Sequence, residues 1–185
     1  MAEYYLVSQL PSLDGIGENM PLPITEERFT ELCNSLLGKK AREELSRLTL
    51  APSRIPEKSG SALVETWNEG ERILRLVLAK LRAEKMNKQF DMGNKSLPVN
   101  LVQAARTAVD AATPMDAEKI LNRYRLDFLE TLRPMDTFSQ DFVFYYGLKL
   151  KLIMRIRQFD TASGEAAYRS IYDSIINSDR SEVTQ

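Results

Sequence analysis

Apolar side chains recur at alternating spacings of four and three residues in the middle of the chain, a period that fits a helix and not a strand. The seam consists of Leu63, Trp67, Gly70, Leu74, Val77 and Leu81, and it is widened by Ile73, Leu76 and Leu78. A stripe this wide favours a buried bundle helix over an exposed coiled-coil zipper, which is the alternative. We therefore predict one long helix from Ser61 to about Phe90. Gly70 should let a neighbouring helix approach closely.

Two shorter helices are expected before residue 51. Thr25 is a suitable N-cap, and Glu26 and Glu27 follow in the first turn, where the helix dipole favours acidic side chains. The apolar face of the first helix consists of Phe29, Leu32, Cys33, Leu36 and Leu37, and that of the second of Ala41, Leu45 and Leu48. Gly38 should end the first helix, and the second should stop before Pro52. Residues 25–50 therefore predict a helical hairpin.

Helix signals continue to the C-terminal region. We expect a helix over Val99–Ala112, and a second that begins at Thr113-Pro114 and ends at Arg133-Pro134. Asp136 or Ser139 should cap the next helix, which runs to about Asp160. A last helix, preceded by Thr161 or Ser163, has an apolar face of Tyr168, Ile171, Tyr172 and Ile175.

The N-terminal residues have a different composition. Tyr4–Leu10 is aromatic and β-branched and meets Pro11, which predicts an extended segment, and Ser12–Pro23 has the glycines and prolines of a loop. The expected fold class is all-α, a bundle of about six or seven helices with a short N-terminal extended segment. The expected organisation is a single domain over 1–185. Its parts are an extended segment and loop (1–24), the hairpin (25–50), a linker-like break (51–60), the main bundle (61–177) and a polar tail (178–185).

Composition excludes several classes of protein. The 185 residues are 43% hydrophobic and 28% charged, as in globular domains, and the net charge of −1 argues against a general nucleic-acid binder. Cys33 is the one cysteine in the sequence, so an internal disulfide cannot form, and its helix face indicates a buried thiol. We expect no membrane-spanning helix and no secretory signal. The expected location is the cytoplasm, with any association at the inner membrane peripheral.

The residues that usually carry catalysis are scarce. The sequence has no histidine, which excludes Ser–His and Cys–His nucleophiles and a histidine zinc site. It also has no Gly-rich phosphate loop. The neighbouring pairs Glu26/Glu27 and Glu43/Glu44 point in different directions on a helix, so we expect them to be solvated. We predict no catalytic, cofactor or metal site and no enzymatic activity; a His-free enzyme that uses carboxylates, Lys or Tyr is an alternative.

The most unusual interior stretch is Phe142–Arg157, which is strongly apolar but contains four cations and no acid after Gly147. We name Lys149, Lys151, Arg155 and Arg157 as candidate partner-contact residues. At helical spacing Lys151 and Arg155 lie together, and Lys149 and Arg157 lie on another side. The alternatives are a core helix whose cations reach solvent, a helix that meets an acidic partner, and a nucleic-acid groove.

Four segments of the chain carry a family resemblance. They are Tyr4–Leu13 with its Ser8-Gln9-Leu10-Pro11, Phe29–Cys33, the stretch from Trp67 to Ala83, and Phe142–Arg155. In this order they resemble a family of small uncharacterised bacterial proteins encoded in operons for V-type ATP synthases. Those operons typically lack a conventional C subunit, an all-helical protein seated between the central shaft and the membrane rotor ring.

The resemblance implies a non-catalytic subunit or assembly factor of a bacterial V-type ATP synthase. It would be a counterpart of the C subunit, although much shorter, and would couple or hold other subunits through helical surfaces. The implied partners are the other V-type ATPase subunits, with no nucleic acid, no membrane insertion and no cofactor. The alternative is an independent cytoplasmic helical adaptor or scaffold protein unrelated to the ATPase.

Overall fold

This computed structural model describes residues 2–16, 20–93, 97–158, 169 and 171–172. The described residues include seven α-helices and no strand. They are α1 (Ala2–Gln9), α2 (Glu26–Leu36), α3 (Lys39–Ser46), α4 (Ala62–Lys85), α5 (Val99–Val109), α6 (Pro114–Thr131) and α7 (Gln140–Arg157). The all-α prediction is confirmed. The predicted C-terminal helix and the tail 178–185 lie outside the described residues, except for Arg169, Ile171 and Tyr172, which are helical.

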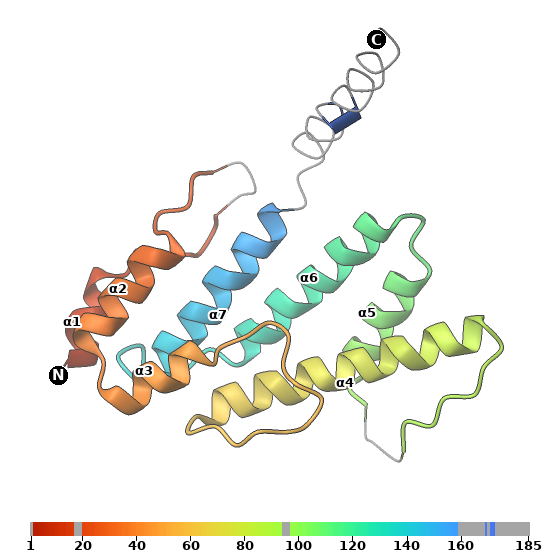
Figure 1. Cartoon of the computed structure of the whole chain (residues 1–185), viewed down its shortest axis with the longest axis horizontal. Coiled ribbons are helices and arrows are strands. Elements are labelled where there is room, and N and C mark those ends of the chain that lie inside the picture. The colour runs from red at the N-terminus through yellow and green to blue at the C-terminus, as the bar shows by residue number, and fades with distance from the viewer. Residues whose placement is uncertain (1, 17–19, 94–96, 159–168, 170, 173–185) are drawn as a thin grey trace, which may run out of the picture.

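Helices α2, α7, α6 and α5 lie in a row, each antiparallel to the next (Figure 1). α3 and α4 run across the lower side of this row in the same view. Helix α7 packs against α1, α2, α3, α4 and α6. Helix α7 therefore links α1, α2 and α3 to α4 and α6.

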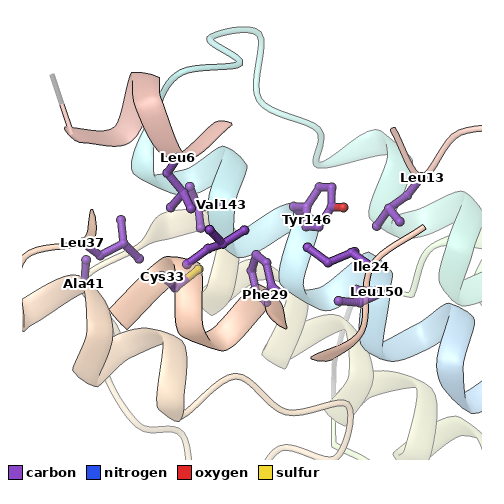
Figure 2. Close-up of a cluster of buried hydrophobic side chains, with 11 residues drawn as sticks. Leu6, Leu13, Ile24, Phe29, Cys33, Leu37, Ala41, Val143, Tyr146 and Leu150 are labelled. Carbon is purple, nitrogen blue, oxygen red and sulfur yellow. The ribbon is translucent and has the colours of Figure 1, made fainter. Parts of the chain in front are cut away.

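The buried apolar residues form three clusters along the row. The first joins α1, α2 and α3 to α7, and Figure 2 shows Leu6, Cys33 and Val143 within it. The second joins α4, α6 and α7 around Trp67, and the third joins α4, α5 and α6 around Leu74. α7 contributes to the first two clusters, and α4 and α6 to the last two. The clusters are thus linked through shared helices.

Helix α7 is buried on almost every side over its first half. Every residue from Val143 to Leu150 is buried. A helix that is apolar all round is buried only if other elements pack on all its faces, and five helices pack against α7. The apolar composition of Phe142–Arg157 is therefore explained by its central position.

The seam of α4 is buried, as predicted, and Gly70 permits a close approach. Leu63, Trp67, Leu74 and Val77 are buried on this face. A Cβ placed on Gly70 would lie 2.4 Å from Cε1 of Phe128, so the α6 side chain occupies the space that any larger residue needs. The helix ends at Lys85 rather than near Phe90. Asn87 adopts a left-handed φ of 53°, and Lys88 N–H donates to the Ala83 carbonyl at 2.9 Å, the Schellman pattern of a helix end.

The prediction of an extended N-terminal segment was wrong, because Tyr4–Leu10 lies almost wholly in α1. Leu6 is fully buried, and Val7 and Leu10 pack on the same cluster, a helical rather than an alternating pattern. Tyr4 and Tyr5 remain exposed. Strand propensity mainly measures packing on a sheet, and the described part of the chain offers no sheet to pair with.

The predicted helix caps at Thr25 and Thr113 are confirmed, and of the two alternatives for α7 the structure selects Ser139. Thr25 accepts from Arg28 N–H at 3.2 Å, and Thr113, followed by Pro at the first helical position, accepts from Asp116 N–H at 3.1 Å. Ser139, rather than Asp136, caps α7 by accepting from Phe142 N–H at 3.2 Å. Gly38 differs from the prediction: it is the N-cap of α3, with φ −67°, and Leu37 is the C-cap of α2.

Candidate partner-contact surface

The four cations of α7 extend toward different elements. Lys149 reaches Asp14 in the loop after α1 and Glu130 in α6, and Lys151 donates to Glu26 in α2. Arg155 donates to Glu118 in α6 at 3.2 Å, and Arg157 donates to the Met20 carbonyl. Lys151 and Arg155, which were expected to lie together, therefore reach helices on opposite sides of α7 (Figure 1).

Lys149 is the centre of a compact polar cluster. Its side chain is 9% exposed, and its ammonium donates to Asp14 Oδ1 at 2.5 Å and Glu130 Oε1 at 2.6 Å. Tyr145 OH donates to the same Glu130 oxygen at 2.8 Å. Lys149 therefore ties the N-terminal loop and the end of α6 to the central helix.

This cluster shifts three pKa values. Burial opposes the charge of Lys149, but hydrogen bonds to Asp14 and Glu130 outweigh it and hold the Lys149 pKa above its usual range. The hydrogen bond from Lys149 lowers the pKa of Asp14, and burial opposes this shift. Burial, followed by the bond to Glu130, raises the pKa of Tyr145 to about 12. The ion pairs therefore persist across neutral pH.

The remaining α7 cations are less enclosed. The Lys151 side chain is 30% exposed and that of Arg155 is 35% exposed, so both are more accessible than Lys149. Contact of Lys149, Lys151, Arg155 and Arg157 with a partner stays a prediction, and their internal hydrogen bonds and ion pairs define what a partner has to displace.

Lys151 also lines a groove between α2, α3 and α7, which we call the α2/α3/α7 groove. It has a volume of about 310 Å³ and is lined by Glu26, Phe29, Thr30, Asn34, Arg42, Leu45, Ser46, Leu48, Gly147, Leu150 and Lys151. A wider and more open hollow of about 720 Å³ lies between α5 and α6, where Val102 and Ile120 are flanked by Arg106, Asp110 and Asp116.

A second buried charged cluster, between α4 and α6, was missed in the sequence. Arg125 Nε donates to Glu71 Oε1 at 2.9 Å, and Arg125 Nη1 donates to Asn122 Oδ1 at 3.1 Å. Glu71 is 1% exposed, and its second oxygen, Oε2, has no hydrogen-bond partner and lies 4.0 Å from Arg75. A sequence signal exists: Glu71 lies four residues after Trp67 and three before Leu74, inside the apolar stripe. The cluster is internal and lines neither groove described above.

Cys33 lies in the first apolar cluster, as predicted. The thiol is fully buried, and burial raises its pKa to about 12. A neutral, enclosed thiol is a poor nucleophile and a poor metal ligand. Within the described ranges, no group of three or more potential Cys, Asp or Glu ligands is arranged to hold a metal ion.

The described helices also include none that is both long enough and apolar enough to cross a lipid bilayer. Even α7 carries Lys and Arg side chains at intervals short enough to interrupt an apolar span.

The fold defines an all-α helical protein organised around α7. Residues 88–178 match the model of a family described as "Protein of unknown function (DUF2764)". The matched stretch includes α5, α6 and α7 and leaves out α1 to α4. The chain matches no curated protein and no solved structure.

Proposed function

We propose that this protein is a non-catalytic subunit or assembly factor of a bacterial V-type ATP synthase, similar to the C subunit in its use of helical surfaces to hold or couple other subunits. The proposal rests first on the ordered resemblance of four segments to proteins encoded in V-type ATP synthase operons. An all-α fold is compatible with it, since the C subunit is itself all-helical.

The packing of the resembling segments supports the proposal. Tyr4–Leu13, Phe29–Cys33 and Phe142–Arg155 meet in the first apolar cluster, through Leu6, Phe29 and Val143 among others. The segment that begins at Trp67 meets α7 in the second cluster. All four resembling segments therefore pack in the two clusters that contain α7, which supports the resemblance that carries the proposal.

The arrangement of charge also favours a binding role over catalysis. The buried charged groups of the two clusters are engaged in ion pairs, Lys149 with Asp14 and Glu130, and Arg125 with Glu71. Acid–base catalysis uses a titratable group that faces a substrate. Groups already paired inside the fold are better suited to fixing helices in place.

The proposal is tested by affinity capture of the tagged full-length chain from cells that encode it, followed by identification of co-purifying proteins. We expect V-type ATPase subunits to be recovered with the chain, and their recovery to fall with increasing salt if charged groups contribute to the contact. Cells expressing the tag alone are the control. Capture that repeatedly yields other proteins and no ATPase subunit would contradict the proposal.

A further inference from the structure

The α2/α3/α7 groove combines an apolar floor with a charged rim. Phe29, Leu45, Leu48 and Leu150 line it, and Gly147 lets the floor close: a Cβ there would lie 3.2 Å from Phe29 and 3.3 Å from Leu48. Its volume of about 310 Å³ is at the lower end of the range of ligand pockets, about 300–1,000 Å³. The groove is thus the size of a few side chains rather than of a large cofactor.

The charges on the rim do not cancel. Lys151 is paired with Glu26, and both line the groove. Arg42 is exposed and donates to the backbone carbonyl of Asn34 at 3.2 Å, and no carboxylate of the described residues lies within ion-pair distance of it. The rim therefore has one guanidinium whose charge lacks an acidic partner in the described chain, next to a floor of leucine and phenylalanine side chains.

We propose that this groove receives a segment of a neighbouring V-type ATPase subunit that places an apolar side chain on the floor and a carboxylate against Arg42. Arginine binds carboxylates through two parallel hydrogen bonds, and an apolar anchor in a pocket is the usual centre of a protein interface. The inference rests on the function proposed above, and it adds the place and the chemistry of the contact.

The open hollow between α5 and α6 is a weaker candidate. Its rim carries both signs of charge, from Arg106, Asp110 and Asp116, and Lys85 already pairs with Asp110 at 2.8 Å. The charge pattern there favours no particular partner, whereas Arg42 favours an acidic one.

The test uses two variants of the tagged full-length chain with matched controls. Thr30→Trp places an indole at an exposed position on the groove wall, and Ser35→Trp does so on the same helix outside the groove. Arg42→Glu reverses the rim charge, and Lys40→Glu makes the same change at an exposed α3 position outside the lining. Circular dichroism and the melting temperature of each variant establish that the fold is kept.

We expect Thr30→Trp and Arg42→Glu to recover about tenfold less of the captured ATPase subunits than the wild-type chain, while both controls recover normal amounts. If the folded Thr30→Trp and Arg42→Glu variants recover as much of the ATPase subunits as the wild-type chain, the groove assignment is overturned and the proposed function stands. Equal losses in the variants and their controls would overturn it as well. A wild-type chain that captures no ATPase subunit would overturn the proposed function, and this inference with it.

Discussion

At the scale of the residue, the absence of a side chain at Gly70 lets Phe128 of α6 pack directly against α4. The Phe128 ring lies over Gly70 and stacks against Trp67 and Tyr124, at centroid distances of 6.0 and 6.2 Å. The ring therefore has to leave its aromatic neighbours before any larger residue fits at position 70.

We predict that Gly70→Leu lowers the free energy of unfolding by about 1–3 kcal/mol through overpacking, despite the better helix propensity of leucine. Urea denaturation measures this. Gly60→Leu is the control for adding the same side chain without overpacking, because Gly60 lies before α4 and a Cβ there meets no atom within 4 Å. Equal stability of the Gly70→Leu and wild-type proteins would show that the ring relocates without cost.

Glu71 and Arg125 form a buried ion pair. The loss of stability on removing it should depend on whether one or both side chains are replaced. Glu71→Leu leaves the Arg125 guanidinium buried with only Asn122 and the more distant Glu118 carboxylate, at 3.6 Å. We predict a loss of about 3 kcal/mol for Glu71→Leu and a much smaller change for Glu71→Leu/Arg125→Met, since a buried ion pair contributes little net stability.

A double-mutant cycle, with the free energy of unfolding measured by chemical denaturation, gives the interaction energy between the two side chains. Additive losses in the single and double variants would indicate that the two side chains act independently, against the 2.9 Å contact between them.

Buried acidic groups with raised pKa values should make the fold sensitive to alkali. Burial raises the pKa of Cys33 and Tyr145 to about 12, and burial, followed by the charge of Glu71, raises that of Tyr124 to about 12. Above pH 9–10 these groups lose protons in the unfolded chain but keep them in the folded protein, so the unfolded state is favoured.

We therefore predict a melting temperature that declines as the pH rises from 9 toward 12, with Cys33→Ala removing the earliest part of the decline. The Cys33→Ala change itself opens a small cavity, so its slope with pH, rather than its absolute stability, is the quantity compared. A melting temperature independent of pH over this range would contradict the raised pKa values of these buried side chains.

At the scale of the element, local signals were sufficient for most helices. The caps at Thr25 and Thr113 and the apolar faces of α2, α4 and α6 could be read from neighbours in sequence, because capping bonds join residues three apart. The prediction for α1 was wrong because a run of eight residues is too short to separate the two periods. Tyr4, Tyr5 and Val7 favoured a strand, and only the packing of Leu6 selects the helix.

The candidate site was less predictable, because its contacts join residues that are far apart in the sequence. The sequence identified the cations of α7, but Lys149 meets Asp14, from which it is separated by 135 positions. No local pattern links two such residues. The α2/α3/α7 groove likewise depends on how three helices pack, so the sequence could name Lys151 but not Arg42.

The buried face of α1 gives a prediction at this scale. Leu6 is fully buried, whereas Tyr5 on the same helix is 61% exposed. We predict that Leu6→Ala lowers the free energy of unfolding by about 2–5 kcal/mol and that Tyr5→Ala changes it by less than about 0.5 kcal/mol. Equal effects of the two changes would mean that α1 is not docked as described.

At the scale of the whole molecule, α7 joins two regions that differ in their relation to known sequences. The family match over 88–178 covers α5, α6 and α7, whereas the first apolar cluster also requires α1, α2 and α3, which lie before it. The α2/α3/α7 groove lies across this boundary, with Arg42 on one side and Lys151 on the other. Its chemistry is therefore a property of the assembled fold and of neither region alone.

The most direct test of the proposed role is to purify the V-type ATP synthase through a tag on its own catalytic subunit, from cells that encode this chain. Quantitative mass spectrometry of the assembled enzyme and of its subassemblies then measures whether the chain is present, with cells lacking its gene as the control. We predict that the chain is recovered at a fixed ratio in the enzyme if it is a subunit, or in subassemblies if it is an assembly factor. Full recovery of the other subunits with this chain absent from every fraction would contradict the proposed role.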